Sequence, residues 1–322
     1  MEKAMFSVLI PTFNPRPEHL RQALERLRAQ TETRWQALVH DDASNVDVRA
    51  MVEPYLSDPR MTFRHSEKRL GIGGNWNACV AQSQEPIVAF LFQDDWWEPE
   101  YLERALAVFR KHEDIGIAAL AHHYAIEDDI VTAQEYRELE ELRKRELTPG
   151  RQEGRAFLEQ WVERGLRPNI IGEPDFVVMR RSLIEETGAF HEEMPQSLDA
   201  EYWVRALRHT NWYFVPELCG TFRVHSEGAT AQNREQGQGL FDRFRMLQQY
   251  IDALPSGERK RAALRAQVKQ FQEMAQKYRG KRDRGDTITL RGAGALKRFC
   301  LRHPLVALHT LWQVQRKNAS KA

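Results

Sequence analysis

Two pairs of adjacent carboxylates stand where apolar segments end. Asp41 and Asp42 follow the apolar run in ALVHDDAS, and Asp94 and Asp95 follow the one in AFLFQDDWW. Adjacent like charges repel unless water, a cation or hydrogen-bond donors compensate them, so each pair is either a solvated turn or part of a site. Because open parallel sheets bind ligands outside the carboxyl ends of their strands, we expect both pairs to face one crevice. The alternative is that each aspartate caps the helix or turn that follows it.

A pair of carboxylates with a divalent cation is a common way to hold a diphosphate. Mg²⁺ and Mn²⁺ prefer oxygen ligands and take only one or two from protein when phosphates supply the others, a demand that Asp94 and Asp95 meet. Other phosphate-binding motifs are missing: the sequence has no G-x-x-x-x-G-K-[ST], and LGIGGNWN lacks the G-x-G-x-x-G pattern. The sequence therefore favours a Mn²⁺ or Mg²⁺ site over a P-loop or a Rossmann dinucleotide site.

Basic and aromatic side chains are further candidates for this site. In FRVH, Arg223 and His225 are two residues apart on an extended segment and share a face, where both could meet phosphate. A lone histidine is more often simply hydrogen-bonded, so both interpretations of His225 stay open. Arg69 is another phosphate candidate. Trp96 and Trp97 either form an apolar wall for a sugar or cover the edge of the sheet.

The elements that would position these residues follow an alternating pattern in the first half of the chain, typical of a mostly parallel central sheet flanked by helices. Strands are expected at 6–10, 37–40, 61–65, 87–92 and 115–121, and helices at 18–28, 46–56, 75–81 and 99–111. A charge-dense segment at about 127–154 predicts a solvated helical insertion. Helices at 156–163, 181–186 and 199–209 then alternate with extended segments at 176–179 and 213–224.

Beyond about residue 232 the pattern is helical only. Paired helices are expected at 241–254 and 259–278, followed by a glycine-containing loop and an amphipathic segment at 304–315. The sequence therefore predicts an α/β domain at 1–232 and a helical C-terminal extension at 233–322. The basic amphipathic tail of this extension suits a helix lying on anionic lipid. Packing of its apolar face against the preceding helices is the alternative.

Charge is unevenly distributed along the chain. The formal net charge is +1, but residues 281–322 carry ten Lys/Arg against two Asp, which leaves the first 280 residues acidic. An acidic body makes nucleic acid an unsuitable partner. The apolar runs fall far short of the roughly 20 residues that cross a bilayer, and the N-terminus lacks a signal-peptide pattern. We therefore expect a cytoplasmic protein, which would be peripheral on the inner face of the membrane if its tail lies on lipid rather than packing on the core.

Seven segments, taken in order, resemble those of family-two glycosyltransferases with the GT-A fold. They are SVLIPTFN, LVHDDAS, GIGGNWNAC, FLFQDDWWEP, VVMRRSLIEETGAF, LDAEYWVRAL and FRVHSEGAT, and together they span about residues 6–232. The resemblance implies a GT-A type nucleotide-diphospho-sugar transferase. Such an enzyme moves a sugar from a nucleotide-sugar donor, here expected to be a UDP-sugar, to a hydroxyl acceptor with inversion, usually with a divalent metal.

The same resemblance implies roles for individual residues. The nucleoside pocket would be lined by Pro11, Thr12, Phe13, Asn14 and Asp42. Asp42 would hold the base and Asp94 would meet the ribose side. Asp95, the last carboxylate of the DXD-like motif, would bind the metal, and His225 would lie near the diphosphate or metal. Gln93 occupies the first position of that motif, where an acidic residue is often replaced in this family.

A third acidic feature lies in QSLDAEYWVRAL. In similar enzymes an acidic residue that opens a helix, followed by Trp and Arg at fixed offsets, is the catalytic base. The register of Trp203 and Arg205 selects Asp199 over Glu201 for this role. A carboxylate in reach of an acceptor hydroxyl can take its proton as the oxygen attacks the anomeric carbon. The alternative is ordinary acidity in the first turn of a helix, which the helix dipole favours.

Two other functions remain open on the sequence. A nucleotidyltransferase would also combine a nucleotide pocket with acidic strand ends, but IPTFNPRP lacks the glycine-rich basic loop expected after the first strand. A non-catalytic nucleotide-sugar-binding relative is favoured by Leu198 and Trp76, which stand where similar enzymes carry acidic and basic residues. The acceptor is expected to be a glycan or a lipid-linked molecule, and family habit suggests cell-surface polysaccharide or lipopolysaccharide assembly.

Overall fold

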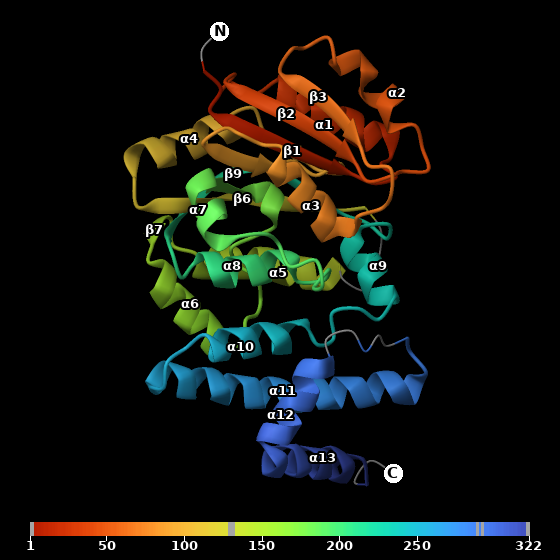
Figure 1. Ribbon diagram of the computed structural model, residues 1–322, viewed down its shortest axis with the longest axis vertical. Helices are drawn as coiled ribbons and strands as arrows, with labels where there is room; N and C mark the ends of the chain where they lie inside the picture. Colours follow the sequence, from red (N-terminus) through yellow and green to blue (C-terminus); the bar gives the residue numbers. More distant parts are fainter. Residues whose placement is uncertain (1–2, 128–132, 288–289, 291–292, 320–322) are drawn as a thin grey trace. The chain divides into compact units, whose positions relative to one another are not determined.

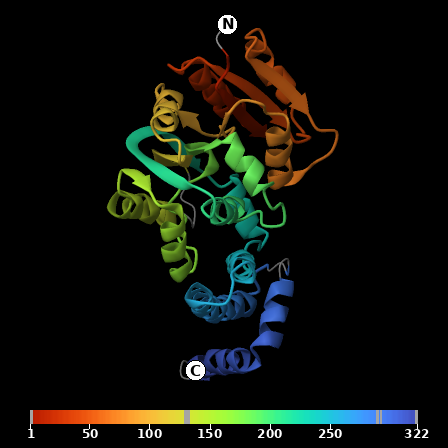
Figure 2. The same cartoon turned by 60° about the vertical axis from the view of Figure 1, so that its left-hand side comes forward.

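The computed structural model describes residues 3–127, 133–287, 290 and 293–319, with side chains described as far as residue 312. The chain forms two compact units, coloured along the sequence in Figure 1 and turned in Figure 2. The first unit consists of Met1–Arg155, Asn169–Glu192 and Arg205–Ser226, and the second of Ala156–Pro168, Glu193–Val204 and Glu227–Ala322. Two short segments that precede residue 232 therefore belong with the C-terminal helices.

The first unit is built on one sheet with the strand order β3-β2-β1-β4-β8-β6-β9-β5, and β7 pairs with β9. The strands are β1 (Phe6–Thr12), β2 (Trp35–Asp41), β3 (Met61–His65), β4 (Ile87–Phe90), β5 (Trp96–Trp97), β6 (Ile115–Ile126), β7 (Gly150–Gln152), β8 (Val177–Arg180) and β9 (Asn211–Val224). Neighbours among β1 to β4 are parallel, whereas β8 is antiparallel to β4 and β6. The acidic pairs thus follow two strands of the parallel part.

Helices and single helical turns connect these strands. They are α1 (Pro17–Arg28), α2 (Val48–Val52), η1 (Glu53–Tyr55), α3 (Gly71–Ala81), α4 (Tyr101–Lys111), α5 (Ala133–Glu146), η2 (Pro174–Phe176) and α7 (Arg181–Thr187). In α1, a proline at the first helical position fits the start of the helix, and Leu20, Leu24 and Leu27 are fully buried at helical spacing. Helix α3 packs on β1 and β2. The mixed α/β architecture expected from the sequence is confirmed.

Several boundaries differ from those expected. The helix expected at 75–81 begins at Gly71, so the glycine-rich segment forms its first turn. The strand expected at 87–92 ends at Phe90, which leaves the second acidic pair in a turn before the two-residue strand β5. Strand β6 continues to Ile126 because β9 pairs with it across three register shifts. Such edge strands and bulges depend on distant partners and have no local sequence signal.

The charged insertion contains α5, as expected, while residues 128–132 lie outside the described part of the chain. One of its charges is not solvated: Arg143 is buried, with Nη1 3.6 Å from Glu173 Oε2 and Nη2 donating to the carbonyl of Ile171. His122 Nε2 lies 3.0 Å from the same Glu173 oxygen. The helix is therefore not only a solvated surface helix, because a buried ion pair joins it to the sheet.

The second unit is helical. It contains α9 (Ala229–Glu235), α10 (Asp242–Asp252), α11 (Glu258–Arg284), α12 (Ala293–Arg302) and α13 (Pro304–Ala319), and parts of α6 (Gly154–Glu163) and α8 (Leu198–Ala206). The paired helices expected near 241–254 and 259–278 are α10 and α11, and α12 replaces part of the expected loop. Phe244, Phe271 and Phe299 form the centre of its core. In the described part of the chain, none of the helices combines the length and apolarity needed to cross a membrane.

Candidate active site

The loops at the carboxyl ends of β1 and β2 are tied together by side chains. The backbone N–H of Asn14 donates to Ser44 Oγ at 2.7 Å, and the N–H of Asn45 donates to Asn14 Oδ1 at the same distance. Asn14 has φ +45°, a left-handed conformation that asparagine tolerates better than most residues. The expected meeting of these strand ends at one edge of the sheet is therefore present.

The loop after β1 is also joined to the turn that carries the second acidic pair. Gln93 Oε1 accepts from the N–H of Phe13 at 2.7 Å, and Gln93 Nε2 donates to the carbonyl of the same residue at 3.1 Å. Both polar groups of one amide side chain thus pair with one residue of the β1 loop. The side chain at the first position of the DXD-like motif holds the acidic turn beside the β1 loop.

Asp42, the residue expected to hold the base, is buried at the end of β2. Its Oδ1 accepts from the N–H of Leu70 at 2.6 Å and its Oδ2 from the N–H of Gly71 at 2.9 Å. Burial raises the pKa of Asp42, and the two N–H groups and Arg69, 3.7 Å away, oppose that rise. Each carboxylate oxygen keeps a second lone pair, so Asp42 retains capacity to accept from a base.

Two neighbours of Asp42 complete this corner. Arg69 lies over the ring of Phe13 at 3.1 Å from the ring centre. Asp41 is buried and accepts from Ser44 Oγ and from His65 Nδ1, the latter at 2.8 Å. Its oxygens are used within the loop, which assigns Asp41 to ordering the turn that presents Asp42. The nucleoside candidates Pro11, Thr12, Phe13 and Asn14 all belong to β1 or to the loop that follows it.

Asp94 lies between two imidazoles. Its Oδ1 is 3.8 Å from His19 Nδ1, and its Oδ2 is 3.4 Å from His225 Nε2. Burial alone would raise the pKa of Asp94, but the contacts with the two histidines lower it to about 2. The contact with Asp94 raises the pKa of His225 in turn. Asp94 is therefore ionised at neutral pH, and 21% of its side chain is exposed.

Asp95 is in a different environment although it is the next residue. It is 2% exposed, and its Oδ1 accepts from the N–H of Arg223 at 2.6 Å. Burial raises the pKa of Asp95 to about 7, and the buried carboxyl of Asp175 is its neighbour. Burial also raises the pKa of Asp175 well above its usual value. Among the described residues no donor reaches the Asp175 oxygens, so we expect the two carboxyls to share one proton.

This shared proton predicts a pH dependence of stability. A carboxyl whose pKa is raised by folding contributes its full stability only below the unfolded value near 4, and the contribution is lost as the pH rises through the folded value. For the metal-free protein we expect the free energy of unfolding to fall between pH 5 and pH 8, by up to about 4 kcal/mol for one retained proton. Asp175→Asn should reduce this fall, as measured by urea unfolding at both pH values. An equal fall in both proteins would mean that no proton is shared.

Arg223, a phosphate candidate, is held by neighbours within the first unit. Its Nε lies 2.8 Å from Glu127 Oε1, and its Nη1 donates to the backbone carbonyl of Asp94. The guanidinium lies over the ring of Trp96 at 4.5 Å from the ring centre. Arg223 thus holds the acidic turn through the backbone carbonyl of Asp94. Its role in binding phosphate stays a prediction.

One aromatic candidate is corrected by the structure. Trp97 is fully buried, stacks on Tyr101 with ring centres 4.0 Å apart, and donates from Nε1 to the carbonyl of Asp175 at 2.8 Å. A side chain without exposed surface cannot form a wall for a sugar, so Trp97 belongs to the sheet and its core. Trp96 is partly exposed beside Arg223 and keeps both interpretations.

The expected base belongs to the second unit. Asp199 is the second residue of α8, and its Oδ1 accepts from the N–H of Ala200 at 2.7 Å. A carboxylate in the first turn of a helix is stabilised in its ionised form by the helix dipole, which suits a group that must accept a proton only during reaction. Its assignment as the base stays a prediction.

Three residues near the acidic turn were missed by the sequence analysis. His19 contacts Asp94, and Glu127 contacts Arg223. His19 and Glu127 also lie 3.7 Å apart. The third residue, Asp175, is the neighbour of Asp95. His19 stands in the first turn of α1, directly after the β1 loop, and this position is the one available sequence signal. Glu127 and Asp175 come from distant parts of the chain, and no spacing rule links them to the site.

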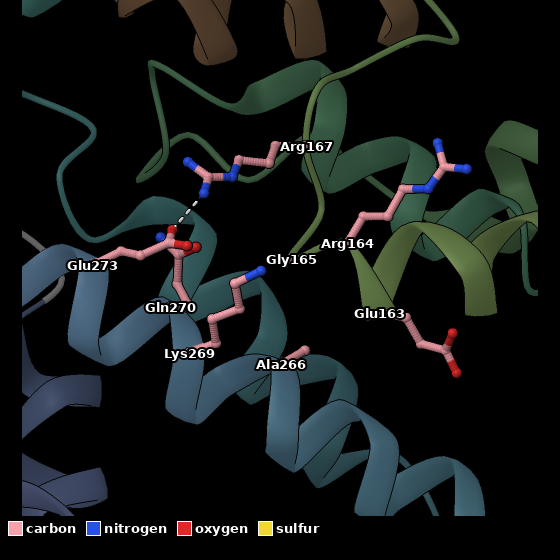
Figure 3. A pocket seen from close by; sticks show the side chains of 8 residues that line it. All are labelled: Glu163, Arg164, Gly165, Arg167, Ala266, Lys269, Gln270 and Glu273. Atoms are coloured by element: carbon pink, nitrogen blue, oxygen red, sulfur yellow. Dashed lines mark hydrogen bonds and ion pairs between the residues drawn. The ribbon is translucent and has the colours of Figure 1, made fainter. Parts of the chain in front are cut away.

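A pocket in the second unit is lined by other residues. Figure 3 shows its charged lining between the turn at Gly165 and helix α11, where Arg167 Nη2 and Glu273 Oε2 form an ion pair at 2.6 Å. Lys269 and Gln270 project toward it from α11. None of the sequence-predicted site residues lines this pocket.

The acidic turn offers few ligands, which suits a cation that takes its remaining ligands from a bound diphosphate. Within the described ranges no three His, Cys, Asp or Glu side chains converge as a metal site. Asp94 and His225 nevertheless offer an ionised carboxylate oxygen and an imidazole nitrogen 3.4 Å apart. Mn²⁺ and Mg²⁺ are often held by one or two protein ligands when a diphosphate supplies more, and imidazole is a better ligand for Mn²⁺ than for Mg²⁺. Asp94 and His225 therefore fit a divalent cation.

Comparisons with known proteins bear on the family and the fold. An uncharacterised protein of Mycobacterium tuberculosis, MT1568, is 29% identical over 265 residues, which are 81% of each chain. The structure of Staphylococcus aureus TarS 1–349 in complex with UDP-GlcNAc matches with a TM-score of 0.61 and 15% identity, over 84% of this chain and 70% of that one. The mannosyltransferase PcManGT of Pyrobaculum calidifontis, in complex with GDP-Man and Mn²⁺, matches with a TM-score of 0.58 and 14% identity, over 97% and 85%.

These structural likenesses show the fold, which is that of GT-A glycosyltransferases. The family is shown by a separate match, because the model of glycosyl transferase family 2 covers residues 7–188, more than half of the chain. The matched region contains both acidic pairs and the loop after β1. The chain belongs to glycosyl transferase family 2.

Proposed function

We propose that the protein is an inverting glycosyltransferase that moves a sugar from a UDP-sugar to a hydroxyl of a glycan or lipid-linked acceptor, with help from a divalent cation. The observation that carries the proposal is the joining of three strand ends. The loops after β1 and β2 and the turn after β4 are linked by hydrogen bonds, and they present Asp42 and Asp94 at one edge of the sheet.

The nucleoside end of the proposed site is the corner formed by the loops after β1 and β2. Asp42 would accept from the base, because its two oxygens keep lone pairs beyond those used by the N–H groups of Leu70 and Gly71. Arg69 and Phe13 would flank the nucleotide from the adjacent loops. Backbone groups fix the orientation of Asp42, but its side chain is 1% exposed, so a base would reach it only after a neighbouring side chain such as that of Arg69 moves.

We place the cation at Asp94 and His225. The sequence favours Asp95 for this role, but Asp95 is 2% exposed, accepts from the N–H of Arg223 and has the buried carboxyl of Asp175 as its neighbour. Asp94 is ionised, partly exposed and 3.4 Å from His225. When bound there with a diphosphate, the cation would offset the negative charge of the leaving group. Asp95 and Asp175 would then hold in place the turn that carries Asp94.

The remaining step is assigned to Asp199. Its carboxylate would take the proton of the acceptor hydroxyl as that oxygen forms a bond to the anomeric carbon. The bond between the anomeric carbon and the diphosphate oxygen breaks on the opposite side of the sugar, and its electron pair stays with UDP. Attack from the face opposite the leaving group inverts the configuration. The nucleophile is the acceptor itself, so one base is sufficient.

Calorimetric titration with UDP tests this function. We expect UDP to bind the full chain at least tenfold more tightly with Mn²⁺ than with EDTA. A screen of UDP-sugars for donor hydrolysis should then identify one that turns over. UDP binding without hydrolysis or transfer of any nucleotide sugar would instead support the non-catalytic relative, the rival that Leu198 and Trp76 favour. Trp76 stacks on Phe92 at 5.2 Å between ring centres, so it fills an aromatic cluster where a basic side chain was expected.

A further inference from the structure

An exposed row of large apolar side chains runs along the last two helices of the second unit. Leu301 is 73% exposed, Leu305 81%, Leu308 65%, Leu311 52% and Trp312 50%. Leu305, Leu308 and Trp312 are spaced at i, i+3 and i+7, which places them on one face of α13. Single exposed leucines are common on soluble proteins, but five large apolar side chains exposed between residues 301 and 312 indicate a surface that binds a partner. We refer to these five residues as the apolar row.

The opposite face of the same helices holds them to the second unit. Phe299 of α12 and Ala307 of α13 are buried in the cluster that contains Phe244 and Phe271. Thr310 is 1% exposed. Helix α13 therefore turns a threonine inward and its leucines outward, the reverse of the arrangement in a helix whose apolar face meets its own core. The packing alternative explains the inner face only, and it does not account for the exposed leucines of the apolar row.

The charge around the apolar row indicates what that partner is. From Thr287 to Ala322 the sequence contains seven Lys/Arg and no Asp or Glu. Lys297, Arg298 and Arg302 belong to α12, which carries the first residue of the row. Of these, Arg302 lies 3.4 Å from Asp252, an exposed pair that leaves the local balance positive. An apolar face within a segment of net positive charge is complementary to a surface with an apolar interior and anionic head groups.

We propose that α12 and α13 lie flat on an anionic lipid bilayer, with the apolar row inserted among the acyl chains and the basic residues at the head groups. A second copy of the chain fits less well, because a symmetric contact through this face would bring two cationic segments together. Nucleic acid would be bound by the charges without any need for exposed leucines. The proposal does not depend on the catalytic assignment, since it uses none of the residues assigned to the active site.

Vesicle co-sedimentation of the full chain tests the proposal. We expect the protein to bind vesicles of phosphatidylglycerol and phosphatidylcholine at least tenfold more tightly than vesicles of phosphatidylcholine alone, and to be released as the salt concentration rises. The double variant Leu308→Ser with Trp312→Ser should lower binding at least tenfold. Lys297→Glu with Arg298→Glu should remove the preference for anionic lipid. The matched control is Leu218→Ser, a leucine 59% exposed on β9 and outside α12 and α13, which should bind as wild type does.

Three results would overturn the proposal. The first is equal binding of the wild type and the Leu308/Trp312 variant to anionic vesicles while both have the same circular dichroism spectrum. The second is equal binding of wild type to both kinds of vesicle. The third is a dimer in sedimentation equilibrium that the Leu308/Trp312 variant dissociates, which would assign the row to a second copy. Donor hydrolysis in solution, measured on the same samples, reports separately on the catalytic assignment, because it needs no membrane.

Discussion

Replacing Asp199 with asparagine is expected to abolish sugar transfer while leaving UDP binding intact. Loss of a general base lowers the rate of such a step by about 10²- to 10⁴-fold. Asparagine has nearly the same shape and can still accept from the N–H of Ala200, so the start of α8 should be preserved. The measurement is a transfer assay with the identified donor, together with calorimetric titration with UDP and Mn²⁺. We expect the Kd for UDP to stay within about twofold of wild type.

Glu201 provides the matched variant for this experiment, because it is the other carboxylate in the first turn of α8. Glu201 is buried, so Glu201→Gln should change stability more than the rate of transfer. Near-wild-type transfer by Asp199→Asn would show that the register argument from Trp203 and Arg205 selected the wrong residue. A selective loss of transfer in Glu201→Gln, with the fold intact, would move the base to that position.

Replacing Asp94 with asparagine is expected to remove the effect of Mn²⁺ on UDP binding. The variant loses the only ionised carboxylate in contact with His225 among the described residues, and with it the charge that attracts a cation. We expect the affinity for UDP measured with Mn²⁺ to fall by about 10- to 100-fold, toward the value measured with EDTA. Titrations with and without Mn²⁺ give both values.

Asp95→Asn separates this assignment from the one that the sequence favours. Because Asp95 is buried against Asp175, its replacement should change the stability of the protein and its pH dependence more than the effect of Mn²⁺ on UDP binding. Glu217→Gln, an exposed change on the same strand as Arg223, serves as the neutral control. If Asp95→Asn loses the effect of Mn²⁺ and Asp94→Asn keeps it, the cation belongs to Asp95 as the motif suggests.

Much of the framework follows from local sequence pattern. The strand and helix spacing of the first half predicts β1 to β4 with their helices, since buried parallel strands have apolar runs and amphipathic helices have a 3.6-residue period. The prediction that Asp42 and Asp94 share one edge of the sheet needs only the rule on parallel strand ends. The structure confirms that edge through the contacts of Asn14 and Gln93.

Which of Asp94 and Asp95 is exposed and which is buried could not be predicted in the same way. Adjacent residues in a turn point in different directions, and which of them is buried depends on what lies behind the turn. Here Asp175, about 80 positions further along the chain, is the buried neighbour of Asp95, whereas His19 contacts Asp94. The burial of Trp97 and Arg143 has the same cause, because each is decided by contacts with residues near Asp175.

The double hydrogen bond between Gln93 and Phe13 has a consequence for how an incomplete acidic motif should be interpreted. A carboxylate at this position could accept from the N–H of Phe13, but it has no proton with which to reach the carbonyl of the same residue at neutral pH. Glutamine satisfies both groups and adds no negative charge next to Asp94. The neutral side chain attracts a cation less than a carboxylate would, but its two hydrogen bonds hold the β1 loop in place in the absence of a nucleotide. Less conformational entropy is then lost when a nucleotide binds.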